Sequence, residues 1–118
     1  MALNTNGKNA LVGGLTGVAA YASLHTAEPN ASGSNEVAGG SYTRESISWN
    51  AASNGTATSS TNIVFDVPAN TTITHLGYWS ASTSGTFYGS RQLDTSQTFS
   101  GSAGTYTITA GNLSESIT

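Results

Sequence analysis

The sequence predicts an all-β protein, either an antiparallel β-sandwich or a jelly-roll-like fold, with one short N-terminal helix. Short segments in which apolar and polar residues alternate recur along the chain, and Gly, Asn and Pro separate them. Only 36% of the residues are apolar. Two packed β-layers suit this composition, because each strand needs apolar residues only at alternate positions. At 118 residues we expect a single domain, in which residues 1–18 form a helical arm and residues 19–118 form the sandwich.

Residues 4–16 are the one helix candidate. Asn4 or Thr5 is suited to cap its start. Leu11 and Leu15 are four residues apart and therefore share one face. The helix also contains a Gly13-Gly14 pair, and each glycine costs about 1 kcal/mol relative to alanine. We therefore expect the leucine face to dock on this domain or on a neighbouring subunit.

Strand candidates follow in order. Residues 19–26 form the first, which Pro29 ends because proline cannot donate to a ladder. Residues 42–49 form the second, with Ile47 and Trp49 facing inward. A polar strand is expected next, at residues 56–60.

The second half of the chain contains the clearest strand, residues 62–67, in which Ile63, Phe65 and Val67 share one face. Residues 72–79 carry large side chains on both faces, which predicts a central, covered strand. Further strands are expected at 86–93, 97–99, 105–109 and 113–117.

The loop of residues 24–44, together with the adjacent Glu45, holds four of the nine formally charged residues. We expect Glu36 and Arg44 to form an ion pair that ties the loop to the next strand. Gly39 and Gly40 permit a tight backbone path. The loop is interpreted as an ordered connection that presents a contact surface to a neighbouring subunit.

The charge balance excludes several classes of partner. The net charge is −3, and Lys8, Arg44 and Arg91 are the only Lys and Arg residues. This leaves no basic surface for nucleic acid or for an anionic membrane. The absence of cysteine excludes disulfides and thiolate chemistry. No apolar run is long enough to span a bilayer, and we expect no signal peptide.

No motif in the sequence indicates catalysis, and we predict no catalytic residue, no metal site and no cofactor. His25, His75 and Asp66 fall on three different strands, and no serine lies in a G-x-S-x-G motif. His75 is expected to be half-buried and bonded to a hydroxyl or a carbonyl group. Glu28 and Glu36 lack the ligand spacing of a calcium loop. Two carboxylate pairs stay open as acid–base candidates: Asp66 with Asp94, and Glu36 with Glu45.

The aromatic residues allow two interpretations. Together they would form a sugar-stacking platform, as in carbohydrate-binding modules; the candidates are Trp49, Tyr78, Trp79 and Tyr88. We favour a core position for both tryptophans, because the other large residues of their strands share their faces. The residues predicted to contact another subunit are Leu11, Leu15, Tyr21, Glu28, Glu36, Tyr42, Arg44 and Tyr88.

Several segments carry a family resemblance: residues 6–11 (NGKNAL), 23–29 (SLHTAEP), 35–44 (NEVAGGSYTR), 65–69 (FDVPA), 74–80 (THLGYWS) and 87–89 (FYG). In this order they resemble small tailed-bacteriophage and prophage proteins labelled tail fibre, minor tail or virion structural proteins. The resemblance covers roughly residues 4–110 and carries over no catalytic residue.

This resemblance implies a non-enzymatic structural protein exposed on a phage particle. The small size and the single domain make a capsid-decoration (cement) protein the leading interpretation. A tail-fibre or minor-tail adhesion protein is the alternative, followed by a host-glycan-binding module. The expected partners are copies of the protein itself, as a trimer, and major capsid or tail proteins, with a host surface glycan as a further candidate. The expected location is the virion, after synthesis in the bacterial cytoplasm.

Overall fold

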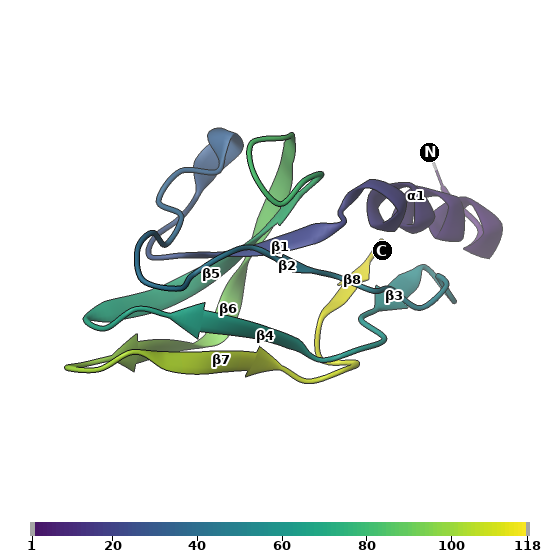
Figure 1. Ribbon diagram of the computed structural model, residues 1–118. Coiled ribbons are helices and arrows are strands. Elements are labelled where there is room, and N and C mark those ends of the chain that lie inside the picture. Colours follow the sequence, from purple (N-terminus) through teal and green to yellow (C-terminus); the bar gives the residue numbers. More distant parts are fainter. Residues whose placement is uncertain (1, 118) are drawn as a thin grey trace.

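The computed structural model describes residues 2–117 and confirms the all-β class. The body is elongated, with extents of 49 × 26 × 22 Å. Helix α1 (Thr5–Val18) lies at one end of it, and the short pair of strands β3 and β8 lies beside the helix (Figure 1). Four strands form the main antiparallel sheet, in the order β2 (Glu45–Ser46), β1 (Tyr21–His25), β5 (Thr71–Trp79), β6 (Phe87–Phe99). Two further antiparallel pairs are β4 (Ile63–Val67) with β7 (Gly104–Ile108), and β3 (Thr56–Thr58) with β8 (Ser114–Ser116).

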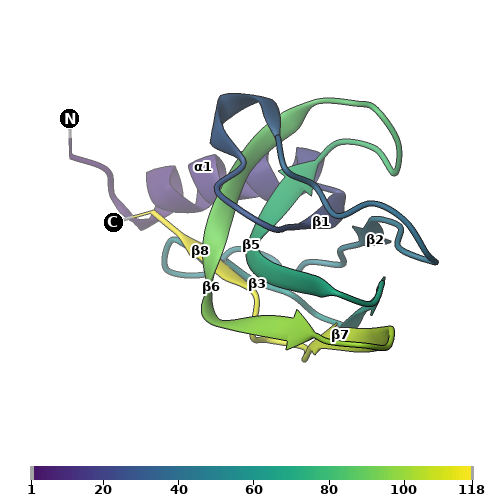
Figure 2. The same cartoon turned by 90° about the vertical axis from the view of Figure 1, so that its left-hand side faces the viewer.

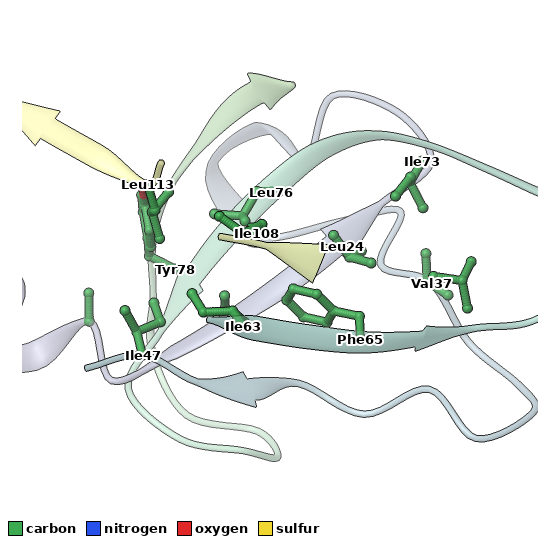
Figure 3. Close-up of a cluster of buried hydrophobic side chains, with 13 residues drawn as sticks. Leu24, Val37, Ile47, Ile63, Phe65, Ile73, Leu76, Tyr78, Ile108 and Leu113 are labelled. Carbon is green, nitrogen blue, oxygen red and sulfur yellow. The ribbon is translucent and has the colours of Figure 1, made fainter. Parts of the chain in front are cut away.

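The hydrophobic core lies between the main sheet and the β4–β7 pair (Figure 3). Strand β4 behaves as predicted, because Ile63, Phe65 and Val67 are buried while the two residues between them are exposed. Leu24 of β1 and Leu76 of β5 face them from the main sheet. Period-two alternation therefore places one apolar face of each layer against the other.

Strand β5 is an interior strand of the main sheet, as predicted, and pairs with β1 on one side and β6 on the other. The predicted alternation along it is nevertheless wrong at one point. Ile73 pairs with Gln97 but His75 pairs with Gln92, so β6 bulges between these two contacts. Because of this irregularity, Ile73 and Leu76 both reach the core. The strands predicted at 86–93 and 97–99 are one strongly curved strand (Figure 2).

Helix α1 begins as predicted, with the Asn4 side chain accepting a 2.9 Å hydrogen bond from the backbone N–H of Gly7. The predicted docking face is half wrong. Val12 is buried and Leu15 packs against the core, whereas Leu11 is 53% exposed. Val12 and Leu15 are three residues apart and share a face, which turns Leu11 toward solvent.

The strand predicted at residues 42–49 is wrong at both ends, because only Glu45–Ser46 pairs as a strand. Beyond it, the backbone N–H of Ile47 bonds to Ala20 O, and Trp49 forms an isolated bridge with Ser59. Ile47 still points into the core as predicted. The backbone groups are thus satisfied, but by scattered partners instead of one ladder.

The predicted loop of residues 24–44 includes the short 3₁₀ helix η1 (Asn30–Ser32). Gly39 and Gly40 have φ values of +102° and +58°, which confirms the tight path predicted for them. Between Ala2 and Ile117, no helix is long and apolar enough to cross a membrane.

Candidate binding surface

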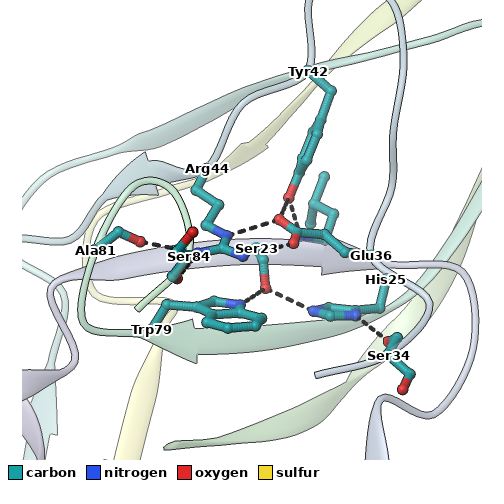
Figure 4. A network of polar contacts seen from close by, with 10 residues as sticks. Ser23, His25, Ser34, Glu36, Tyr42, Arg44, Trp79, Ala81 and Ser84 are labelled. Carbon is teal, nitrogen blue, oxygen red and sulfur yellow. Dashed lines mark hydrogen bonds and ion pairs between the residues drawn. The ribbon is translucent and has the colours of Figure 1, made fainter. Parts of the chain in front are cut away.

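A buried polar network holds the loop of residues 26–44 against the main sheet (Figure 4). We use this name for the side chains of Ser23, His25, Glu36, Tyr42, Arg44 and Trp79, with the carbonyl groups that they contact. Strand β1 supplies the first two, β5 supplies Trp79, and the loop supplies the others. The register of β1 against β5 pairs Ser23 with Gly77 and His25 with His75, and so sets the position of the network.

Ser23, His25 and Trp79 form a chain of hydrogen bonds in this network. The Trp79 indole N–H donates to Ser23 Oγ at 2.8 Å, and Ser23 Oγ lies 2.7 Å from His25 Nε2. His25 Nδ1 lies 2.8 Å from the carbonyl oxygen of Ser34. A carbonyl oxygen only accepts, so Nδ1 carries the ring proton and Nε2 accepts from the Ser23 hydroxyl. Both ring nitrogens of His25 are thus bonded within the protein.

The Ser23–His25 pair is enclosed by the protein. Both residues are 0% exposed. Burial lowers the pKa of His25, because the charged imidazolium would lose its hydration. A Cβ atom at Gly77 would lie 2.6 Å from Ser23 Oγ and 2.7 Å from His25 Nε2, so the glycine is what lets the strands approach here. This serine and histidine have no surface at which to meet a substrate, and they order the loop instead.

Arg44 is the second centre of the network, and the predicted ion pair with Glu36 is confirmed. Nε and Nη2 of Arg44 donate to the two Glu36 carboxylate oxygens at 3.0 and 2.9 Å. Nη1 donates to the carbonyl oxygens of Ala81 and Ser84, at 3.1 and 2.8 Å. The guanidinium carbon lies 3.6 Å from the centroid of the Trp79 ring. Arg44 thereby joins the loop of residues 26–44 to the loop of residues 80–86.

Tyr42 completes the network. Its hydroxyl donates to Glu36 Oε2 at 2.8 Å and accepts from the backbone N–H of Leu24 at 3.0 Å. Burial raises the pKa of Tyr42. Three of the residues predicted to contact another subunit, namely Glu36, Tyr42 and Arg44, are thus engaged within the chain. A contact between them and a neighbour stays a prediction.

The other predicted contact residues are spread over the molecule. Leu11 and Tyr88 are exposed, Leu15 and Tyr21 are partly buried, and the Glu28 side chain is 71% exposed. Glu28 lies 3.7 Å from Nε2 of His75, whose Nδ1 is 2.8 Å from the Thr74 hydroxyl. The half-buried, hydroxyl-bonded histidine is confirmed. Nothing groups these residues into one patch.

The sugar-stacking platform predicted as one alternative does not form, because the core prediction for the tryptophans is confirmed. Trp79 is buried, and Trp49 packs against the core while its indole N–H donates to Ala19 O at 3.0 Å. Tyr78 is also buried, and its hydroxyl donates a hydrogen bond to Glu115. Within residues 2–117, no three His, Asp or Glu residues gather as metal ligands.

A groove of about 450 Å³ forms a second polar region, where the curve of β6 passes β7. Its apolar floor consists of Leu76, Ile108 and Leu113. Its polar rim includes Gln92, Asp94, Gln97, Tyr106 and Asn112. Sequence reasoning missed this site, because the groove depends on the bulge that interrupts β6. A second irregularity lies at Gly89, where the sequence predicts a bulge or a close backbone approach: Tyr78 pairs with Gly89 but Trp79 pairs with Phe87, and this confirms a bulge there.

The comparison with protein families bears on the whole folded chain. A family model described as "Gp80: Podophage GP4 fiber I protein gp80" matches residues 9–116. The chain belongs to this family. A search of curated proteins gave no match.

Membership of the Gp80 fibre family makes this a bacteriophage fibre-type structural protein. The resemblance to phage virion proteins is confirmed at that level, and a fibre family indicates a component of the virion. Capsid decoration, the leading interpretation of the sequence, gains no support from a fibre family. The tail-fibre alternative is the better supported of the two.

Proposed function

We propose that this protein is a non-enzymatic structural component of a phage tail fibre. The observation that carries the proposal is the match to the Gp80 fibre family, which extends over residues 9–116 and so includes every strand of the fold. The buried polar network agrees with a structural role, because its serine and histidine are enclosed and bonded to each other. The fibre would act through area burial and backbone pairing with other virion proteins.

Labelling of intact particles tests this location. Antibodies raised against the purified protein, detected with gold particles by electron microscopy, are expected to mark the tail. Label spread over the capsid would overturn the tail assignment in favour of capsid decoration. Major capsid protein and tail proteins are the corresponding partners, and crosslinking of the labelled particles identifies which of them lies beside the fibre protein.

We also propose that copies of the chain associate, with a trimer as the expected state. Leu11 and Val18 on α1 are 53% and 42% exposed, although both are apolar. The low charge of the chain, −3 overall, presents little repulsion between copies. Light scattering at micromolar concentration is expected to show a trimer that Leu11→Ser weakens. A stable monomer for the unaltered protein would contradict self-association in solution.

Absence of catalysis is part of the same proposal. The purified protein is expected to release no product from host surface polysaccharide or peptidoglycan over hours of incubation. Turnover that disappears in His75→Gln would overturn the non-enzymatic assignment, because His75 is the histidine with side-chain surface accessible to solvent.

A further inference from the structure

The groove beside β6 owes its shape to an irregularity in the main sheet. Residues 93–96 of β6 have no partner on β5, since pairing passes from Gln92–His75 directly to Gln97–Ile73. The strand turns away from β5 over these residues, and the space below it opens toward β7. Buried Leu76, Ile108 and Leu113 close the bottom. The volume of about 450 Å³ falls within the range of small-ligand sites.

The rim of the groove carries polar side chains that the protein itself does not use. Among the described residues, the side chains of Gln92, Asp94, Gln97 and Asn112 form no hydrogen bond to another protein group, and all four residues are exposed. The amides both donate and accept, and the carboxylate accepts. This is the combination that hydroxyl groups require, because each hydroxyl is a donor and an acceptor at once.

Tyr106 adds an aromatic surface to the same rim. Its ring is half-buried and its hydroxyl has no partner within residues 2–117. Asp94 lines the same groove. Burial raises the pKa of Tyr106, and the charge of Asp94 raises it further. A ring beside hydrogen-bonding groups presents an apolar face and polar atoms to one ligand.

The charges of the groove restrict the ligand further. Arg91 is its one cation, and Nη1 of Arg91 already bonds to the Ser114 carbonyl oxygen and, at 3.1 Å, to Glu115 Oε2. Asp94 has no cationic partner among the described ion pairs. Arg91, Asp94 and the Glu115 carboxylate that Arg91 contacts together carry a net charge of −1. This charge disfavours acidic ligands and favours neutral or cationic ones.

We propose that this groove binds an oligosaccharide of neutral or amino sugars. The apolar face of a sugar ring packs on Tyr106, and its hydroxyl groups bond to Gln92, Asp94 and Gln97. An extended peptide fits less well, because it needs a continuous strand edge for pairing and β6 is interrupted between Gln92 and Gln97. The inference goes beyond the proposed function, since a fibre protein without a saccharide site would still be located on the tail.

Titration of the ¹⁵N-labelled full chain, followed by NMR, tests the groove directly. The probes are tetramers of glucose, N-acetylglucosamine and glucosamine, with tetragalacturonate as the acidic comparison. We expect at least one of the first three to shift the backbone resonances of residues 91–97 and 106–113, and the acidic tetramer to leave them unchanged. Weak binding, in the millimolar range, is sufficient for this measurement.

Substitutions in the rim connect the shifts to the site. Asp94→Ala and Gln97→Ala remove exposed side chains without internal bonds, so both variants are expected to fold and each to weaken binding about tenfold. Tyr106→Ala is expected to abolish binding; because Tyr106 also packs against the core, the amide spectrum of this variant must first show the native fold. Tyr88→Ala controls for the loss of a tyrosine outside the groove. Tetragalacturonate binding, unaltered affinity in the rim variants, or no shift with any tetramer at 10 mM overturns the inference. Gold labelling of the tail is independent of all these results.

Discussion

The buried polar network and the groove contain nearly the same kinds of side chain, yet the structure uses them in opposite ways. Each has an arginine, at least one carboxylate and a tyrosine. In the network, Arg44 and Glu36 bond to each other. The Tyr42 hydroxyl bonds to the Glu36 carboxylate and to the backbone N–H of Leu24. In the groove, Asp94 and Tyr106 have no protein partner among the described residues. Composition thus does not distinguish a structural polar cluster from a binding surface, whereas internal hydrogen bonding does.

The largest loss of stability is expected when a side chain is added at Gly77, where the backbone lies closest to the network. Gly77→Ala places a methyl group within 3 Å of Ser23, His25 and Phe87. We expect about 3 kcal/mol of destabilisation in urea unfolding, because strands must separate or buried hydrogen bonds must break. Gly13→Ala is the control, since its new Cβ meets nothing within 4 Å. It lies inside α1 and should stabilise the protein by up to about 1 kcal/mol. Equal effects for the two alanines would contradict this account.

The two arginines give the next comparison. Arg44→Ala removes the cation and two of the donors that Glu36 contacts, leaving it the Tyr42 hydroxyl, and it removes the guanidinium donor to two carbonyl oxygens. We expect a loss of about 2 to 3 kcal/mol in the free energy of unfolding. Arg91→Ala removes a salt bridge whose arginine side chain is 37% exposed, and should cost about 1 kcal/mol or less. The loss of stability for Arg44→Lys should lie between those for Arg44→Ala and Arg91→Ala, because lysine keeps the charge but loses the bidentate geometry. A larger loss for Arg91 than for Arg44 in chemical denaturation would reverse the assignment of the two regions.

The buried histidine of the network, His25, should make the stability of the protein depend on pH. The folded protein lowers the pKa of His25 below its usual 6.5. Below pH 6.5 the unfolded chain therefore binds a proton that the folded chain does not bind, and stability falls as the pH decreases from 6.5 toward the folded pKa. At pH values well above 6.5 the His25 ring is neutral in both states, and the free energy of unfolding no longer depends on its titration. The measurement is the NMR titration of the His25 ring in the folded protein, together with the free energy of unfolding between pH 5 and 8. A midpoint for His25 at or above 6.5 would contradict the burial argument.

The smallest effects belong to the groove. Asp94→Ala and Gln97→Ala should change the free energy of unfolding by no more than about 0.5 kcal/mol, because exposed side chains without partners contribute little to stability. The same two substitutions are expected to impair saccharide binding. A loss of several kcal/mol on either substitution would show that the rim has a structural role, and the contrast between the two regions would disappear.

Local patterns predicted the parts of the fold that depend on neighbours in sequence. The alternation of Ile63, Phe65 and Val67 identified β4, and Asn4 marked the start of α1. The Glu36–Arg44 ion pair was also predictable, because the chain has few charges and these two flank one loop. Each of these features is decided within about ten residues, where spacing in sequence determines spacing in space.

The rest depends on register between distant strands. Ser23 meets Trp79, and His25 meets the Gly77 backbone, only because Tyr21 pairs with Trp79. The bulge of β6, which opens the groove, likewise reflects the fit of two strands and leaves no sign in the alternation of either. The strand predicted around Tyr42 failed for the same reason, since that tyrosine points its hydroxyl at Glu36 and the backbone of Leu24. Propensity along one segment contains no information about such pairings.

The pairing of β3 with β8 has a consequence for the order in which the chain can fold. Thr56 pairs with Ser116 and Thr58 with Ser114, so these partners are synthesised far apart in time. Helix α1 rests on the β3 turn, where Asn9 accepts a hydrogen bond from Gly55. The N-terminal helix therefore reaches its final support only after the ribosome has released nearly all of the described chain. Contacts between such distant segments slow folding, and a chain interrupted before Ser114 would leave both β3 and its helix without their closing strand.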